Sequence, residues 1–473
     1  MGTTNTSLDA AISDIRSGQQ GPAIAAFFDF TAISDSGSRY RGLPRGRDRK
    51  VAQLLLTGIP RDGGDAAYGR YLHTAGELLA GRTEDELAAL GDRLFRRAGY
   101  GRLYPEAWRL IAAHRAAGHT IVLISSLTEF QVAPAAAVLG IDHVLCTRMV
   151  VVDGRLTGQP ADKVLWRQRK ADAAAEFAAT DGVDLENSYA YTGAAADLPL
   201  LSLVGHPCTT SPDTGLVTAA TERDLPILTF RPRNPPDAGD YARTFAGFGG
   251  LIGGSLFGVL VKSYTRQRRP MADSLMKYGT AATLRLCGVR LRVTGQEHAR
   301  TPRPAVFVFN HQSQFDVIIV PAVLQGGVTG IGKKELTRNP VFGPLMRFVG
   351  VTFIDRGDTA RAKASLEPVV ATLRDGLSIA VAPEGTRSYT PEVGPFKKGA
   401  FHIALQAGVP VIPVIIRNAG ELSWRDSMIV RRGTVDVTIG EPIDVSGWDP
   451  ADMHDEVAAV RQLFIDTLLD WPS

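Results

Sequence analysis

Short apolar segments alternate with longer helical stretches along the whole sequence, and this alternation most constrains the fold. Segments 24–29 (IAAFFD) and 120–125 (TIVLIS) have the length and apolar character of strands buried on both faces, and Tyr189–Thr192 is a weaker third. The helical stretches between and after them include Glu84–Arg97, Glu106–Ala117 and Asp162–Ala179. An α/β fold is therefore expected.

The alternation is interrupted once, at Arg231–Asp240, where three prolines disfavour both helix and strand. Strands are expected again beyond it, at Ala305–Phe309, Ser378–Val381, Val411–Ile416 and Thr434–Ile439. A length of 473 residues allows two to four domains. We predict a polar tail at 1–21, a first α/β domain at 22–230, a linker at 231–240, a helical segment at 241–290 and a second α/β domain at 291–473.

Composition excludes several classes of protein. The 52 basic and 49 acidic residues nearly balance, so the overall charge does not indicate a nucleic-acid-binding protein. Cys146, Cys208 and Cys287 lie far apart, which excludes a disulfide framework and paired-cysteine zinc sites and favours a reducing compartment. The N-terminal segment lacks the pattern of a secretory signal, so we expect the chain to start in the cytoplasm.

Segment 244–261 is uncharged, rich in glycine and about as long as the shortest spanning helix. Basic residues follow it directly, as expected beside an anionic membrane surface: Lys262, Arg266, Arg268 and Arg269. A helix that lies in the membrane interface is favoured over a spanning one, because a span would place the two halves of the chain on opposite sides. An ordinary buried helix with small residues at a packing seam is the alternative.

The expected strand Ala305–Phe309 is followed by the sequence NHQSQFD, residues 310–316. On one continuous helix His311 and Asp316 would diverge by about 140°, so they can meet only if His311 lies on the turn and Asp316 begins the helix. In that arrangement Asp316 would orient the imidazole of His311, and its other nitrogen could accept a proton from a substrate hydroxyl. A structural helix cap is the alternative for the pair taken alone.

Basic and glycine-containing motifs follow other expected strands. PEGTRS contains Glu384, Gly385, Thr386 and Arg387, and glycine with arginine suits close approach to a phosphate. Further cations are Arg356 in GVTFIDR, Lys397 and Lys398 in FKKGA, and Lys333. A solvated charged surface is the alternative, but it does not explain why such groups, apart from Lys397 and Lys398, follow strands, where α/β sheets bind ligands.

These motifs, in this order and with VPVIPV at 409–414, resemble the glycerolipid acyltransferase family that includes bacterial 1-acylglycerol-3-phosphate acyltransferases. The resemblance covers about residues 241–473. It implies an α/β acyltransferase domain in which His311 is the general base and Asp316 positions it. It also associates Arg356 and residues 384–387 with the phosphate of the acceptor, and implies that helices in 241–290 seat the domain on a membrane.

The implied reaction is acyl transfer from acyl-CoA or an acyl carrier protein to the free hydroxyl of a lysophospholipid, with lysophosphatidate as the favoured acceptor. No metal or other cofactor is expected to be required. We expect backbone amides near the His311 turn to stabilise the oxyanion. The expected location is the cytoplasmic face of a membrane, as a peripheral or monotopic protein with no nucleic-acid partner.

The N-terminal half, about residues 22–225, resembles haloacid dehalogenase-like phosphatases of the phosphoserine phosphatase type. The resemblance implies a Rossmann-like domain with a helical cap after the first motif. It places the nucleophile on Asp29, the second motif on Ser125, the third on Lys163 and the fourth on 190–201, including Asp197. A working member also needs an acid/base aspartate two residues after the nucleophile, and carboxylates in the fourth motif for Mg²⁺.

The sequence departs from that pattern at Thr31, which replaces the acid/base aspartate, and at Gly193, which replaces the first aspartate of the fourth motif. We therefore favour a degenerate, non-catalytic domain with at most a vestigial Mg²⁺ site. Two other readings stay open. One is an Mg²⁺-dependent phosphatase of a metabolite or lipid, recruited to membrane by the C-terminal half. The other is a lipid-binding protein without activity in either half.

Overall fold

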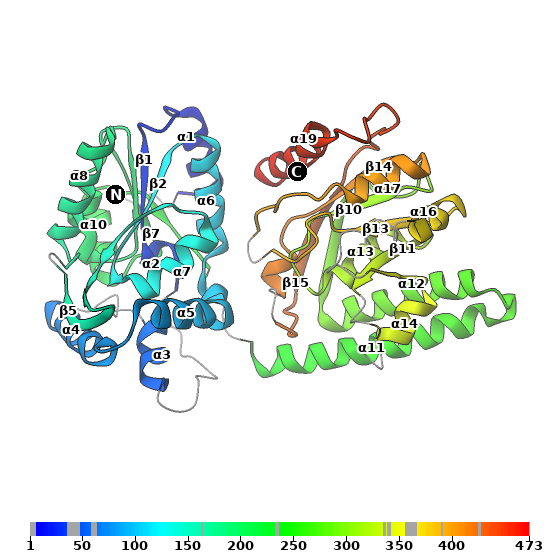
Figure 1. Ribbon diagram of the computed structural model, residues 1–473, viewed down its shortest axis with the longest axis horizontal. Helices are drawn as coiled ribbons and strands as arrows, with labels where there is room; N and C mark the ends of the chain where they lie inside the picture. Colours follow the sequence, from blue (N-terminus) through cyan, green and yellow to red (C-terminus); the bar gives the residue numbers. More distant parts are fainter. Residues whose placement is uncertain are drawn as a thin grey trace. The chain divides into compact units, whose positions relative to one another are not determined.

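The chain divides into two compact units, residues 1–235 and 236–473, and the division falls inside the proline-rich segment 231–240. The computed structural model describes residues 6–35, 48–57, 64–161, 164–231, 236–333, 337, 342–354, 367–388, 391–423 and 427–472. Each unit is an α/β structure built around one main sheet (Figure 1).

Unit 1 contains a parallel six-stranded sheet in the order β3-β2-β1-β6-β7-β8 and a separate β4-β5 hairpin. The central strand β1 is buried along its whole length, as expected of a strand covered by helices on both faces. The strands are β1 (Ala25–Asp29), β2 (Thr120–Thr128), β3 (His143–Thr147), β4 (Met149–Val152), β5 (Arg155–Pro160), β6 (Tyr189–Thr192), β7 (His206–Thr210) and β8 (Ile227–Leu228).

The helices of unit 1 differ from expectation at three places. The expected polar tail contains α1, which Ser7 caps and which packs on α6 through buried Ile12 and Ile15, so it is part of the unit. The stretch Glu84–Arg97 is α-helical only to Leu94 and continues as a π turn. Helix α8 begins at Gln168 rather than Asp162. The α-helices are α1 (Leu8–Ser17), α2 (Phe30–Ile33), α3 (Arg49–Leu56), α4 (Asp65–Leu79), α5 (Glu84–Leu94), α6 (Pro105–Ala116), α7 (Glu129–Leu139), α8 (Gln168–Asp181), α9 (Leu198–Leu201) and α10 (Thr214–Glu222).

Unit 2 contains a seven-stranded sheet in the order β12-β11-β13-β10-β14-β15-β9. All neighbouring pairs are parallel except β14 with β15. The strands are β9 (Val289–Thr294), β10 (Val306–Phe309), β11 (Val328–Lys333), β12 (Thr352–Ile354), β13 (Ser378–Val381), β14 (Val411–Ile416) and β15 (Gly433–Ile439). The boundary expected at 290/291 is wrong, because it would cut through β9, which pairs with β15 along the sheet edge.

Both faces of this sheet are covered. Phe307 of β10 packs into one apolar cluster with α13, whereas Val306 and Val308 pack into a second cluster with α16, α17 and α19. The α-helices of unit 2 are α11 (Ala238–Lys262), α12 (Arg268–Cys287), α13 (Asp316–Leu324), α14 (Phe342–Phe348), α16 (Glu367–Arg374), α17 (Gly399–Ala407), α18 (Ala419–Leu422) and α19 (His454–Leu469).

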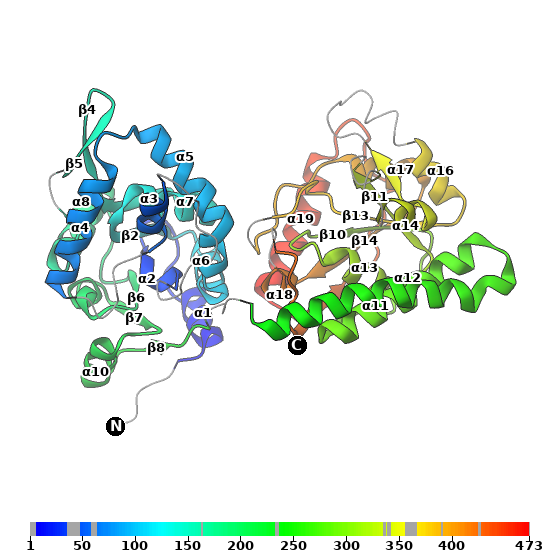
Figure 2. The ribbon, with the colours of Figure 1, turned by 90° about the horizontal axis from the view of Figure 1, so that it is seen from below.

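Helices α11 and α12 form a long hairpin that is visible from two directions (Figures 1 and 2). Glycines of α11 lie directly against α12: a Cβ on Gly254 would lie 2.5 Å from the carbonyl oxygen of Tyr278, and one on Gly258 would lie 2.4 Å from that of Ser274. The glycine-rich sequence thus permits close helix packing. The opposite side of α11 is exposed, so α11 is not an ordinary buried helix.

Among the described residues, α11 with the turn that follows it, Ala238–Thr265, is the one helix long and apolar enough to cross a membrane. Only 22% of the residues in its apolar 18-residue stretch are buried.

Candidate active site

The carboxyl ends of four neighbouring parallel strands, β12, β11, β13 and β10, meet at one edge of the unit 2 sheet. NHQSQFD follows β10, EGTRS follows β13, and Lys333 is the last residue of β11. Parallel strands therefore bring together motifs that lie up to about 80 residues apart. Arg356, expected to follow β12, lies outside the described residues, as does the side chain of Lys333.

His311 and Asp316 form a hydrogen-bonded pair. His311 lies in the loop after β10 and Asp316 is the first residue of α13, the arrangement that their spacing required. Nδ1 of His311 lies 2.7 Å from Oδ2 of Asp316. The same carboxylate oxygen accepts hydrogen bonds from the backbone N–H groups of Gln312 and Ser313, both at 2.9 Å. Asp316 is fully buried, whereas the His311 side chain is 23% exposed, so the imidazole is both held and accessible.

The loop that carries His311 is also fixed to the sheet. The Asn310 side-chain amide donates to the carbonyl oxygen of Ile416 on β14 and accepts the N–H of the same residue. The Ser313 hydroxyl donates to the carbonyl oxygen of Ser423 at 2.6 Å. These two anchors were not singled out from the sequence, because a hydrogen bond to a distant backbone leaves no local pattern.

The EGTRS segment contacts this loop directly. The Ser388 N–H donates to the carbonyl oxygen of His311 at 2.8 Å. Gly385 has φ of +74°, a left-handed conformation that favours glycine, and a Cβ there would lie 3.0 Å from the Lys397 ammonium. Thr386 is exposed and Arg387 is half-buried, and Lys398 lies just before α17 with its side chain exposed. Of the predicted basic residues, Arg387 thus directly precedes the residue that contacts the His311 loop, and Lys397 lies beside Gly385.

The expected oxyanion donors near this turn are not the amides of residues 311–313. The N–H groups of Gln312 and Ser313 bind Asp316, and the N–H of His311 binds Glu384. These amides are therefore committed to carboxylates and cannot stabilise an oxyanion.

Unit 1 has a second charged centre, at the carboxyl end of β1. The Lys170 ammonium lies 2.7 Å from Asp29 and 2.6 Å from Asp197, and all three side chains are buried. Burial alone would lower the pKa of Lys170, but the attraction of Asp197 and Asp29 outweighs it and raises that pKa. Burial raises the pKa of Asp197 to about 6, against the opposing attraction of Lys170.

Lys170 was missed in the sequence, where the third motif was placed on Lys163, a residue outside the described part of the chain. The available signal was helical spacing. Lys170 lies on the same face of α8 as Ala174 and Ala178, four and eight residues later, and that face is buried.

The residues around Asp29 do not fit an Mg²⁺ site. Oδ1 of Asp29 accepts the N–H and the hydroxyl of Thr31, while Oδ2 binds Lys170. Gly193 has no side chain to offer and its N–H donates to the Thr31 hydroxyl. Ser125 is buried and its hydroxyl accepts the N–H of Leu127. Thus Asp29 and Asp197 are the two carboxylates that these motifs supply, and both contact the same lysine.

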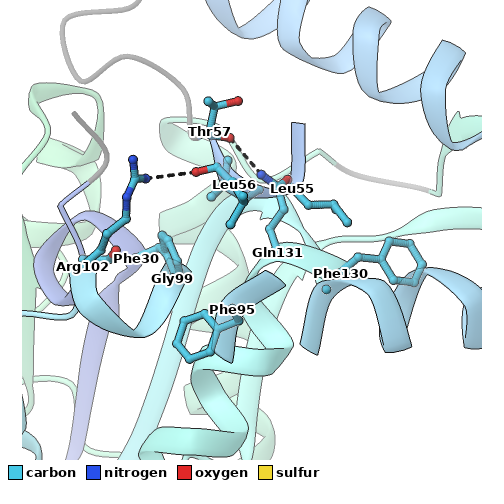
Figure 3. A pocket seen from close by; sticks show the side chains of 12 residues that line it. Phe30, Leu55, Leu56, Thr57, Phe95, Gly99, Arg102, Phe130 and Gln131 are labelled. Carbon is cyan, nitrogen blue, oxygen red and sulfur yellow. Dashed lines mark hydrogen bonds between the residues drawn. The ribbon is translucent and has the colours of Figure 1, made fainter. Parts of the chain in front are cut away.

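A cavity of about 30 Å³ lies close by, lined by Phe30, Arg102 and Gln131 and by parts of α3 and α5 (Figure 3). Arg102 donates to the carbonyl oxygen of Leu56, and Gln131 donates to that of Thr57. The volume is about that of one or two water molecules.

Family comparisons agree with this division. Residues 290–417 match the acyltransferase family, and residues 28–202 match the haloacid dehalogenase-like hydrolase family. The chain therefore carries a haloacid dehalogenase-like domain followed by an acyltransferase domain.

Individual relatives include proteins named as acyltransferases and one named as a probable phosphatase. A 1-acyl-sn-glycerol-3-phosphate acyltransferase of Cocos nucifera is 32% identical over 185 residues, which is 39% of this chain and 59% of the relative. The Saccharomyces cerevisiae protein of that name is 32% identical over 186 residues, 39% of this chain and 61% of the relative. A probable phosphatase of Mycobacterium tuberculosis is 39% identical over 173 residues, 35% of this chain and 60% of the relative. The matches thus span about three-fifths of each relative.

A solved structure is also similar. The crystal structure of the 1-acyl-sn-glycerophosphate acyltransferase of Thermotoga maritima aligns with a TM-score of 0.43 and 25% identity, over 50% of this chain and 98% of that one.

Proposed function

We propose that the protein transfers an acyl group from acyl-CoA or an acyl carrier protein to the free hydroxyl of a lysophospholipid, with lysophosphatidate as the acceptor and phosphatidate as the product. The observation that carries the proposal is the His311–Asp316 pair at the strand ends, in direct contact with the EGTRS segment. The names of the acyltransferase relatives support the same acceptor.

In this proposal His311 is the general base. Because Nδ1 donates to the Asp316 carboxylate, the lone pair lies on Nε2, the nitrogen that the described residues leave without a hydrogen bond. Nε2 takes the proton of the acceptor hydroxyl as its oxygen attacks the thioester carbonyl. The tetrahedral intermediate then expels the thiolate, which receives that proton from the imidazolium. The step needs no metal and no covalent acyl-enzyme.

The predicted basic residues supply the acceptor site in this proposal. Arg387 has the planar fork that suits phosphate, and Lys397 and Lys398 add two ammonium groups. Lys333, the last residue of β11, and Arg356, which follows β12 in the sequence, are proposed to complete it.

The test is transfer of a radiolabelled acyl group to a panel of lysophospholipids in liposomes. We expect wild type to form product, and His311→Ala to lower the rate by about 10² to 10⁴. His454→Ala, an exposed histidine on α19, is the matched control and should keep full activity. Absence of product from wild type with every acceptor, and with both donors, would refute the proposal.

We also propose that unit 1 does not catalyse phosphate transfer, because Thr31 replaces the acid/base and the Asp29 carboxylate is saturated by Thr31 and Lys170. Asp29→Asn should therefore leave acyl transfer unchanged in the same assay. Mg²⁺-dependent phosphate release by wild type that Asp29→Asn abolishes would instead support the phosphatase alternative.

The proposed location is the cytoplasmic face of a membrane, as a peripheral or monotopic protein. Support comes from the side of α11 that faces away from α12, where Phe245 is 72%, Leu256 67% and Leu260 71% exposed. Such a row of large apolar residues beside Lys262 and Arg266 suits an anionic lipid surface.

A further inference from the structure

Glu384 of the EGTRS segment has both carboxylate oxygens bound to the backbone. Oε1 accepts the N–H of His311 at 2.7 Å, and Oε2 accepts the N–H of Gly394 at 2.9 Å. The side chain is buried. It therefore links Gly394 to the loop that carries the proposed base.

Gly394, the second partner of Glu384, is also fixed by hydrogen bonds. Arg461 of α19 donates to the carbonyl oxygen of Gly394 at 2.9 Å and to that of Val393 at 2.8 Å. Glu384 thus connects His311 to a peptide that a helix on the sheet holds in place.

His311 therefore makes hydrogen bonds with three different residues. Glu384 holds its N–H, the Ser388 N–H holds its carbonyl oxygen, and Asp316 holds Nδ1. Orientation of this kind matters because a misplacement of about 1 Å at a reacting group can cost about 10² in rate.

A role for Glu384 as a ligand of the acceptor's phosphate fits these contacts poorly. A carboxylate next to a phosphate would repel it, and both Glu384 oxygens already accept protein N–H groups. The residues of the same segment that suit an anion are Thr386 and Arg387.

We propose that Glu384 is a positioning residue that fixes the backbone of His311 for proton abstraction, a role that rests on the proposed acyl transfer. The variant Glu384→Gln keeps the size of the side chain, but its amide N–H₂ must face one of the two backbone N–H groups. We expect kcat to fall about 10²-fold while KM for lysophosphatidate stays within about threefold.

Two further measurements separate positioning from a general loss of structure. Hydrogen exchange of the His311 amide in the full-length protein should become faster in Glu384→Gln, while exchange in the β10 and β14 amides stays unchanged. Gly394→Ala approaches the same carboxylate from the other side, since its Cβ would lie 3.0 Å from Oε2 of Glu384, and should lower kcat in the same direction. Glu441→Gln, an exposed glutamate, is the matched control and should behave as wild type.

The proposal is overturned if Glu384→Gln raises KM for lysophosphatidate and keeps kcat, or if the His311 amide retains its protection. Should Glu384→Gln fail to fold, a normal kcat in Gly394→Ala overturns it. If wild type itself forms no product, the proposed function fails, and the exchange of the His311 amide still decides whether Glu384 holds that peptide.

Discussion

At the scale of single residues, carboxylates in both units act as acceptors for protein donors. Asp316 accepts three hydrogen bonds through one oxygen, and Glu384 accepts one through each. Burial raises the pKa of Glu384, while the N–H groups of His311 and Gly394 oppose that rise. In unit 1, by contrast, Asp29 and Asp197 depend on one buried ammonium for their charge balance.

Removing that ammonium should therefore be costly. We expect Lys170→Met to destabilise unit 1 by about 3 to 5 kcal/mol at pH 8, because two buried carboxylates lose their counter-ion. The pKa of Asp197, which burial already raises, would rise further without the attraction of Lys170, so the stability that depends on this group is present at low pH and is lost as the pH rises. The pKa of Asp197 is about 6 in wild type. The loss of unfolding free energy caused by Lys170→Met should therefore be smaller at pH 5 than at pH 8.

Denaturant unfolding of the full-length protein at the two pH values measures this difference. Lys50→Met, an exposed lysine of the same unit, is the control and should change stability little. If Lys170→Met lowers the free energy of unfolding equally at pH 5 and pH 8, the loss does not come from the charge of the buried carboxylates.

At the scale of elements, the sequence predicts best where a local pattern decides the structure. β6, β13 and β14 begin and end where the apolar runs predict, and His311 with Asp316 meet as their spacing requires. β9 and the Lys170 contacts were not foreseen, because an edge strand of alternating character and a lysine on a helix depend on partners far along the chain. For the glycines of 244–261 a packing seam was only the alternative to a membrane-interface helix, and the sequence did not indicate which helix they would contact.

The α11–α12 contact can be tested with two adjacent glycines. A Cβ on Gly254 would lie 2.5 Å from the Tyr278 carbonyl oxygen, whereas nothing lies within 4 Å of one on Gly253. We expect Gly254→Ala to destabilise unit 2 by about 1 to 3 kcal/mol through overpacking. Gly253→Ala should stabilise the helix by up to about 1 kcal/mol, because alanine favours helix over glycine. Thermal unfolding of the two full-length variants would show shifts of opposite sign, and equal shifts would contradict the close packing.

At the scale of the whole molecule, the chain combines two α/β units with separate charged centres, one at Asp29 and one at His311. Lysophospholipid acceptors reside in membranes, so the proposed function requires the chain to reach a lipid surface. The exposed side of α11 is the feature of the described residues that suits this contact.

Membrane binding by the full-length protein should therefore depend on that side of α11. We expect Leu256→Glu with Leu260→Glu to lower the fraction that floats with anionic liposomes by about tenfold or more, since each replacement removes apolar burial and adds a repelled charge. Leu463→Glu, at a similarly apolar but separate exposed position on α19, should float like wild type. Equal flotation of all three proteins would show that another surface binds the lipid.

The pairing of β9 with β15 has a consequence for how the chain folds during synthesis. β9 is the first strand of unit 2 to leave the ribosome, but its partner β15 follows only after all the other strands of the sheet. Until then the backbone N–H and C=O groups of β9 form an unpaired edge, a feature that favours aggregation. The α11–α12 hairpin, whose second helix ends just before β9, can form from local contacts in that interval. With the membrane binding proposed for α11, contact of this hairpin with lipid would keep the growing chain at the membrane surface until β15 has been synthesised.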